Sequence, residues 1–335
     1  RPMRVTANDS DRRIDINNLN MWVTNYGSFA WDILTGNSGL VYPKGTTKTA
    51  VFASGLWLGA TVDPGAEVRI ALAEYSQEYG PGKMVGGTFD NPNRADYKVY
   101  KVIRFTGDPN DTAHVDRVSE YPEDPLVHHS WSEYMSGAVP YGAPWKTYRL
   151  PYADVVAPAD TDSVSVPGPD VLGDQMLWCV YNDADGTLHV NNAGQTNPLG
   201  VEVQQTTFGF NRQGALGNTV FIKFRLINAG PDTLSNMFCS MWADPDLGGF
   251  TDDLVGCDTT LSLGYCYNAT NDDQQYGGAP PAVGYDFFLG PVSRVTGDTL
   301  GLVSFNKYVN GTDPGSSDET YNYMQGLLPD GSELI

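Results

Sequence analysis

The sequence predicts an all-β or β-dominated protein of antiparallel β-sandwich modules, immunoglobulin-like or jelly-roll-like, with long loops and a few short helices. Three observations support this fold class. Gly (37), Pro (22) and Tyr (19) are abundant, whereas charged residues make up only 18% of the chain. The apolar segments are short and are separated by turn-forming residues. Several segments alternate apolar and polar residues over about ten positions, which is the pattern of half-buried strands.

The N-terminal part contains four predicted strands after a polar lead-in. Residues 1–20 mix Asp and Arg, so we expect them to be extended and solvated. Residues 21–25 form a plausible strand, and residues 50–63 are apolar on both faces, which predicts a buried central strand. Residues 67–75 follow a Pro-Gly turn, and we expect them to form a strand that pairs with residues 50–63. Residues 98–105 alternate and predict a further strand.

The middle of the chain carries the weakest strand pattern. Residues 111–119 and 130–137 have the length and polarity of short helices, with Asp111 and Ser130 as N-caps. Residues 151–171 show no clear period and predict a loop. The expected division is an N-terminal β-rich domain at 1–150, a linker or long loop at 151–174 and a C-terminal sandwich-like domain at 175–335, with one large β domain as the alternative.

The strand pattern becomes stronger after residue 175. Residues 175–182 and 187–190 flank a turn at 183–186, which predicts a hairpin. Residues 201–211, 219–228 and 234–244 follow with short turns between them, which predicts an antiparallel meander or one sheet of a sandwich. Within the second of these strands, the apolar residues at 220, 222, 224 and 226 should share one face.

The charge of the chain limits its partners. The 335 residues include 20 Lys and Arg against 40 Asp and Glu, a formal net charge of −20. This charge disfavours binding to nucleic acid or to an anionic membrane surface. No apolar run is long enough to span a membrane. Because 41% of the residues are hydrophobic, the acidity belongs to a folded protein and not to a disordered tail.

Four cysteines predict two disulfides in an oxidising compartment. Cys257 and Cys266 bracket a turn-containing segment, and Cys179 and Cys239 lie in apolar strands, so one connectivity is Cys257–Cys266 with Cys179–Cys239. Four cysteines allow three connectivities, and buried free thiols are the alternative. A zinc site is not expected, because the chain has no C-x₂-C pair.

The most specific chemistry lies where an apolar strand runs into an acidic loop. Five aspartates fall within fifteen residues: Asp244, Asp246, Asp252, Asp253 and Asp258. Their carboxylates would repel one another unless they were solvated, protonated or bound to a cation. A hard cation with oxygen ligands, calcium before magnesium, is the simplest resolution, and a solvated acidic turn is the alternative. A weaker polar cluster follows it: Asn268, Asn271, Asp272 and Asp273.

The acidic loop only partly matches a known calcium motif. With Asp244 as its first position, Asp246 and Asp252 fall at positions three and nine of an EF-hand loop. Val255 stands where that loop needs a bidentate Glu, and the flanking segments are not helical in pattern. We therefore expect a calcium-binding loop attached to a strand, and no EF-hand.

The chain shows no catalytic motif. It lacks both G-x-S-x-G and H-E-x-x-H. His128 and His129, beside Trp131 and Glu133, could line a site but are more often surface or packing residues. The abundant Tyr and Trp could stack on sugars, although in an antiparallel β protein they more often fill the core. We expect a protein that is not an enzyme.

Two blocks of the sequence resemble a known group of proteins. Residues 20–60, beginning NMWVTNYGSFAWDILTG, and residues 204–268, which contain INAGPDTLSNMFCSMWADPDLGG, are similar to N-terminal regions of large secreted or cell-surface proteins of Bacteroidota and related phyla. Many of these proteins are type IX secretion substrates. The resemblance implies export and a longer chain, and it implies no particular activity.

A recurrent triplet agrees with export. Asp-(Ser/Thr)-(apolar or Thr), which resembles the O-glycosylation signal of exported Bacteroidota proteins, occurs mostly at predicted turns. Its candidate acceptor residues are Thr112, Ser163, Thr233, Thr259 and Thr299.

These observations together predict a function. We expect a non-catalytic extracellular or cell-surface structural protein, found there after signal-peptide removal, stabilised by calcium and able to self-assemble into a filament or surface layer. Its expected partners are copies of itself, other cell-surface proteins and glycans. The alternative is a secreted carbohydrate-binding or carbohydrate-processing protein.

Overall fold

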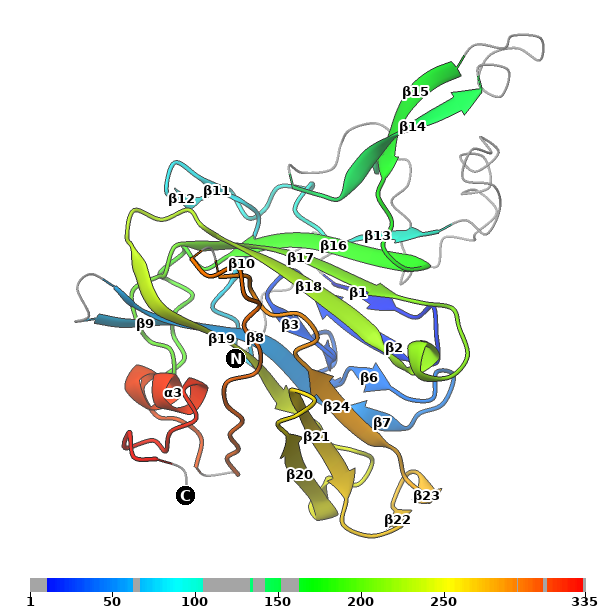
Figure 1. The fold of residues 1–335 in the computed structure, drawn as a ribbon, viewed down its shortest axis with the longest axis vertical. Coiled ribbons are helices and arrows are strands. Elements are labelled where there is room, and N and C mark those ends of the chain that lie inside the picture. Colours follow the sequence, from blue (N-terminus) through cyan, green and yellow to red (C-terminus); the bar gives the residue numbers. More distant parts are fainter. Residues whose placement is uncertain are drawn as a thin grey trace.

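The computed structural model describes residues 11–62, 67–104, 133–134, 142–151, 163–293, 295–309 and 312–333. Strands dominate these residues, and every strand pairing among them is antiparallel (Figure 1). The predicted β-dominated, sandwich-like fold class is therefore confirmed. The predicted helix at 111–119 and the His128–His129 pair lie outside the described residues, as does most of the helix predicted at 130–137.

The main sheet has β8 at its centre. β8 pairs with β19 along one edge and with β9 and β3 along the other. Its strands are β1 (Asp11–Ile14), β2 (Asn20–Thr24), β3 (Ser28–Phe29), β6 (Leu40–Val41), β7 (Thr49–Val51), β8 (Ala53–Val62), β9 (Glu67–Leu72) and β19 (Leu234–Asp244). The predicted strands at 21–25, 50–63 and 67–75 all belong to it.

The second sheet faces the main sheet across the largest core. It contains β10 (Gly80–Pro81), β13 (Tyr100–Ile103), β16 (Gln175–Asn182), β17 (Val201–Gly209) and β18 (Val220–Asn228). Leu177, Cys179 and Tyr181 of β16 pack into the first core cluster with Leu56 and Leu58 of β8. All eight residues of β16 are buried, because the alternate residues enter a second core cluster on the other face.

Smaller sheets and helices surround this sandwich. The three-stranded sheet of β20 (Asp253–Asp258), β21 (Leu263–Asn268) and β24 (Ala282–Asp286) follows β19. Two-stranded sheets are formed by β4 (Trp31–Asp32) with β5 (Asn37–Ser38), β11 (Met84–Val85) with β12 (Thr88–Phe89), β14 (Trp145–Pro151) with β15 (Ser163–Pro169), and β22 (Asp272–Asp273) with β23 (Gly277–Gly278). The helices are η3 (Ala215–Asn218), η4 (Phe250–Asp252) and α3 (Ser317–Met324).

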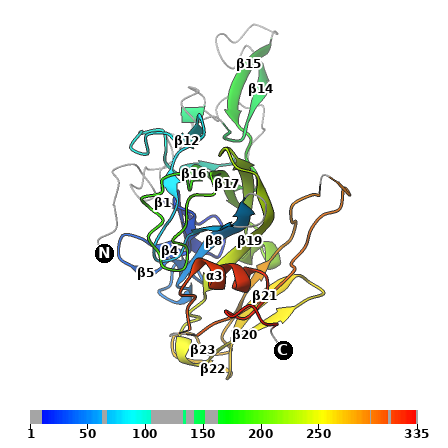
Figure 2. The same cartoon turned by 90° about the vertical axis from the view of Figure 1, so that its left-hand side faces the viewer.

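Helix α3 covers part of the main sheet (Figure 2). Ser316 caps its N-terminus by accepting a hydrogen bond from the Glu319 backbone N–H. Tyr321 and Met324 pack against Trp57 and Ile70. The Tyr321 hydroxyl donates to the Asn236 carbonyl at 2.6 Å, at the irregularity in the pairing of β19 with β8. Helix α3 therefore lies across β9, β8 and β19 and connects these three neighbouring strands of the main sheet.

The structure differs from two predictions about the C-terminal strands. Residues 187–190 do not form a strand, because the backbone turns away after β16 and the Asp183 carboxylate accepts the backbone N–H groups of Leu199 and Val201. β17 and β18 form the predicted hairpin, but β19 pairs with β8 of the other sheet. The three strands therefore form no meander. The side chains at 220, 222, 224 and 226 share the core-facing side of β18, as predicted.

Two further segments also differ from prediction. Residues 151–171 were expected to be a loop, but Ser163–Pro169 forms β15 and pairs with β14. Part of the predicted solvated lead-in is strand β1, in which Arg12 and Ile14 are buried. Next to it, buried Lys101 makes an ion pair with Asp15 at 2.8 Å. Lys101 is far from the lead-in in the sequence, so the polar pattern of the lead-in did not reveal that part of the lead-in is buried.

Close packing around β8 leaves no room for a side chain at Gly55. A Cβ atom on Gly55 would lie 1.9 Å from the Ala73 carbonyl oxygen, which is backbone and cannot rotate away. Gly55→Ala should therefore lower the free energy of unfolding by about 3 kcal/mol, the upper part of the range for overpacking, as measured by urea denaturation. Gly278→Ala is the control, because no atom lies within 4 Å of its Cβ position. Equal stability of the two variants would contradict the packing described for β8.

Candidate functional site

The first candidate site is an acidic corner at the junction of the main sheet and the three-stranded sheet. We define it as Asp244, Asp246, Asp252, Asp253 and Asp273. β19 ends at Asp244 and β20 begins at Asp253, so the loop between them turns the chain from one sheet into the other. None of the ion pairs among the described residues involves these five carboxylates. The corner is therefore a concentration of negative charge without a Lys or Arg partner.

The negative charge of the corner raises the pKa values of Asp246 and Asp253. Burial, together with the neighbouring charges of Asp244 and Asp253, raises the pKa of Asp246 to about 6. Burial also raises the pKa of Asp253, and the charges of Asp252, Asp273 and Asp244 add to the effect. Four of the five predicted aspartates thus lie within electrostatic reach of one another.

The fifth predicted aspartate, Asp258, does not belong to the corner. It stands at the opposite end of β20 from Asp253, roughly 16 Å away at about 3.3 Å per residue. Its carboxylate accepts hydrogen bonds from Thr260 and from the Leu261 backbone, which lower its pKa. Asp258 is therefore a turn residue, and the five predicted aspartates cannot share one ion.

Asp273 organises the backbone of the acidic corner, although the sequence pattern placed it only in the weaker polar cluster. It is 6% exposed and accepts backbone N–H groups from Gly249 at 2.7 Å, Gln275 at 2.8 Å and Tyr276 at 2.6 Å. Burial raises its pKa, but these donors outweigh burial and hold the pKa below its usual value. Gly248 has φ +71°, and a Cβ there would lie 2.2 Å from the Asp273 carboxylate, so this approach requires glycine.

Two oxygen atoms, one in the acidic corner and one beside it, have no hydrogen-bond partner. Oδ2 of Asp253 accepts the Leu247 backbone N–H at 2.8 Å, but its Oδ1 is buried and unpartnered. Oδ1 of Asn268, which stands opposite Asp253 in the β20–β21 register, is also buried and unpartnered. Nδ2 of the same Asn268 donates weakly to Asp252 and Asp273. Buried acceptors of this kind usually have a partner.

The donor atoms suit a hard cation, but they are not assembled around one. Carboxylate and amide oxygens are the ligands that calcium prefers. As the side chains stand, no three Asp, Glu, His or Cys residues within the described part of the chain form a group that could hold a metal ion. A cation would therefore need some of the corner's carboxylates to turn toward one another.

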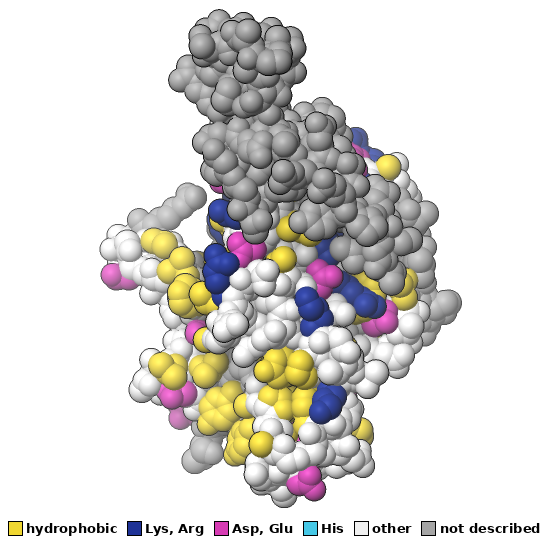
Figure 3. Space-filling model, turned by 90° about the vertical axis from the view of Figure 1, so that its right-hand side faces the viewer, with side chains coloured by type: hydrophobic (Ala, Val, Ile, Leu, Met, Phe, Trp, Pro, Cys, Tyr) yellow, Lys and Arg dark blue, Asp and Glu magenta, His cyan; other side chains and the backbone are white. Residues whose placement is uncertain are grey.

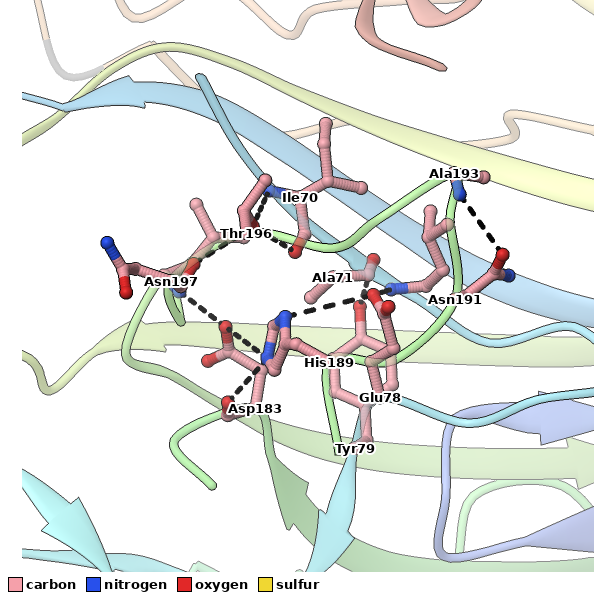
Figure 4. Close-up of polar contacts among 12 residues, drawn as sticks. Ile70, Ala71, Glu78, Tyr79, Asp183, His189, Asn191, Ala193, Thr196 and Asn197 are labelled. Atoms are coloured by element: carbon pink, nitrogen blue, oxygen red, sulfur yellow. Dashed lines mark hydrogen bonds and ion pairs between the residues drawn. The ribbon is translucent and has the colours of Figure 1, made fainter. Parts of the chain in front are cut away.

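The second candidate site is a buried polar network that the sequence did not reveal. In Figure 4, His189 lies between Glu78 and Asp183. Its Nε2 donates to the Asp183 carbonyl oxygen at 2.9 Å, because a carbonyl can only accept. The two carboxylates stand 3.8 Å from the imidazole, Glu78 at Nδ1 and Asp183 at Nε2. A carboxylate–imidazole pair is a common catalytic arrangement, so access to solvent decides what this one can do.

Solvent does not reach this network. Glu78 and Asp183 are 0% exposed and His189 is 4% exposed. Glu78 accepts the Leu72 backbone N–H at the end of β9. Asp183, which follows β16, accepts the backbone N–H groups of Leu199 and Val201 at the start of β17. Burial raises the pKa of Glu78 to about 9. Burial also raises the pKa of Asp183, while the charge of His189 and the backbone hydrogen bonds act to lower it. The network joins β9, β16 and the loop after β16.

The four cysteines are free thiols, so neither predicted disulfide is formed. Cys179 and Cys239 enter the first core from strands of opposite sheets. Cys266 lies opposite Val255, and Cys257 lies opposite Gly264 in the β20–β21 register, so these two are not a directly facing pair. Burial and the charges of Asp253, Asp246 and Asp244 raise the pKa of Cys266 to about 12, which keeps it a neutral thiol beside the acidic corner.

Three of the predicted glycosylation residues are accessible. Thr233, Thr259 and Thr299 are exposed, as an acceptor residue must be. The backbone of Ser163 begins β15, and Thr112 lies outside the described residues. Glycosylation stays a prediction.

Comparisons with known proteins add no identification. No protein-family model, no curated protein and no solved structure matches the chain. Among the described helices, none has the length and apolar character needed to cross a membrane.

Asp273 provides a test of how the corner is organised. Asp273→Ala removes the acceptor for three backbone N–H groups, so we expect a loss of about 3 kcal/mol or more in the free energy of unfolding, measured by denaturant titration. Asp272→Ala is the control, because the neighbouring side chain is exposed and should change stability by no more than about 0.5 kcal/mol. Similar effects of both substitutions would contradict the role assigned to Asp273.

Glu78 should make stability depend on pH. Its pKa rises from 4.5 to about 9 on folding, so the folded state retains a proton that the unfolded state releases between these values. The stabilisation is complete below about pH 4.5 and falls as pH rises, by up to about 1.4 kcal/mol per pH unit. Glu78→Gln should flatten this decline in pH-dependent urea unfolding. The exposed Glu333→Gln should leave it unchanged, and parallel curves for wild type and Glu78→Gln would refute the assignment.

Proposed function

We propose that this chain is a non-catalytic, calcium-stabilised structural module of a secreted or cell-surface protein. The observation that carries the proposal is the acidic corner, where carboxylates without basic partners join two sheets. A bound divalent cation would neutralise this repulsion and fasten the start of β20 to the end of β19. Such a clamp suits a protein that must keep its shape outside the cell, where calcium is available at concentrations that weak sites can use.

The corner's own chemistry supports calcium as the ion. Asp246 has a pKa near 6 because Asp244 and Asp253 oppose its ionisation, and a cation would reverse that effect. The unpartnered oxygens of Asp253 and Asn268 would supply further ligands. The corner lies in a loop, which favours the flexible, many-oxygen coordination of calcium over the strict octahedron of magnesium.

The buried network supports a role without catalysis. Glu78, Asp183 and His189 are the described residues that most resemble a catalytic set, and a substrate could not touch them without unfolding of the surrounding loops. Their hydrogen bonds go to backbone groups of neighbouring strands and loops. Such a network specifies one arrangement of the chain.

Exposed apolar side chains support association with other proteins. The side chains of four residues are between 74% and 95% exposed: Phe288, Leu289, Val295 and Val303. They lie in the segment after β24 that projects from the body in Figure 2. Figure 3 shows hydrophobic side chains gathered over the lower half of one face. Monomeric soluble proteins rarely leave large apolar patches uncovered, so partners at the cell surface, including copies of this chain, would cover them.

Calcium dependence is the direct test of this proposal. Calcium at a hundredfold excess over its Kd should stabilise the folded chain by about 2.7 kcal/mol, seen as a rise in Tm by differential scanning calorimetry that a chelator reverses. Asp246→Asn should abolish most of the rise. Asp258→Asn should retain it, because Asp258 lies outside the corner. A Tm that is the same with calcium and with chelator would refute calcium stabilisation.

A further inference from the structure

The three-stranded sheet presents two chemically different faces. Val255, Cys266 and Val283 stand opposite one another in the register and pack against the first core. Because side chains alternate along a strand, the residues between them point away from the core. We call this outward side, centred on Tyr265 and Tyr267 of β21, the tyrosine face.

The middle of the tyrosine face is an aromatic ring flanked by glycines. Tyr265 stands opposite Gly256 on one side and Gly284 on the other. The far end of its ring lies only 2.6–2.9 Å from where a Cβ of Gly256 would be. The Tyr265 side chain therefore lies across the neighbouring strand, along the sheet surface. Because both residues opposite Tyr265 are glycines, neither of them places a side chain beside its ring, and Leu263 of the adjacent row covers the Gly284 side.

A second ring extends this surface. The rings of Tyr265 and Tyr267 have centroids 5.9 Å apart with an interplanar angle of 40°. Tyr267 is 40% exposed, and Leu254 beside it is 45% exposed. A solvent-facing pair of tyrosines on a stiff sheet pays little conformational entropy on binding a ligand, and each ring offers an apolar face with a polar hydroxyl at its end.

Carboxylates border the tyrosine face at one end. Asp258 and Asp286 flank Leu263 in the adjacent row of the same face. Carboxylates accept hydrogen bonds from hydroxyl groups, and they repel anionic ligands, as does the net charge of −20. A ligand that fits this face therefore has apolar C–H surfaces that can stack on the tyrosine rings. It also has hydroxyl donors at its edge and carries no negative charge.

We propose that the tyrosine face binds a neutral polysaccharide chain, with sugar rings stacked on Tyr265 and Tyr267 and hydroxyl groups donating to Asp258 and Asp286. The proposal rests on the extracellular setting of the proposed function, where such polymers occur. A second copy of the chain fits less well, because the exposed aliphatic surface of the face is small, with Leu254 as its one large exposed aliphatic side chain among the described residues, and because two carboxylates border it. An anionic membrane surface is disfavoured by the same carboxylates.

Affinity electrophoresis in gels containing neutral polysaccharides tests the proposal. The probes are a mixed-linkage β-glucan, xylan, mannan and dextran, with alginate as an anionic comparison. Wild type should be retarded by at least one neutral polymer and not by alginate. Tyr267→Ala should weaken the apparent affinity at least tenfold, because it removes one of the two rings on which the sugars would stack. Asp286→Asn should weaken it less, because it keeps an acceptor oxygen.

Two controls separate binding from folding and from general stickiness. Trp145→Ala removes an aromatic residue that is 64% exposed on β14, away from the tyrosine face (Figure 1), and should bind like wild type. In calorimetry, Tyr267→Ala should have the same Tm and the same response to calcium as wild type. Failure of the polysaccharide proposal can therefore be distinguished from failure of the calcium proposal. Retardation by none of the neutral polymers, or equal retardation of wild type and Tyr267→Ala, would overturn the proposal. So would a wild-type dimer in light scattering that Tyr267→Ala dissociates, since the face would then bind a second copy.

Discussion

The pairing of β8 with β19 is the interaction on which the rest of the structure depends. It runs from Val62 opposite Leu234 to Ala53 opposite Asp244 and brings together segments far apart in the sequence. β8 is almost wholly buried, so its backbone groups must find partners within the sheets. Without β19, one edge of the central strand of the main sheet would be left unpaired.

The position of both polar sites follows from this pairing. At the Asp244 end of β19, the chain leaves the main sheet and forms the acidic corner, with the Tyr75 hydroxyl donating to the Asp244 carboxylate. On the other edge of β8, β9 leads to Glu78 and the network around His189. One site holds excess negative charge near the surface, and the other hides its carboxyl groups in the interior. Burial raises carboxyl pKa values in both, and in both the neighbouring carboxylates add to the effect, Asp244 and Asp253 at Asp246 and Glu74 and Asp183 at Glu78.

Local pattern predicted the longest strands of the two main sheets, which are β8, β9, β16, β17, β18 and β19. The alternation in β18 and the continuous apolar run of β16 were sufficient to predict these strands. The reason is that each side of a strand is either buried or exposed, and this determines which of its residues are apolar. The acidic loop was also found from spacing, since five aspartates in one short segment need no long-range information. Asp258 was wrongly grouped with the rest because β20 is extended, and extension separates residues that are near in sequence.

What the sequence could not show was pairing between distant segments. Nothing in residues 234–244 indicates that they join β8 instead of β18, because both neighbours would bury the same apolar side chains. Glu78 and His189 are ordinary residues in isolation, and only the fold brings them together. The strand β15 in the expected linker was missed because its Pro, Ser and Val residues have no clear period.

Native-state hydrogen exchange measures whether the β8–β19 pairing holds the structure together. If the pairing of β8 and β19 holds the structure together, backbone amides of both strands should exchange only through global unfolding, with the same opening free energy and the same dependence on denaturant. The outer β14–β15 hairpin should exchange through smaller openings. Exchange of the β19 amides at a lower free energy, while those of β8 and β17 remain protected, would contradict the account.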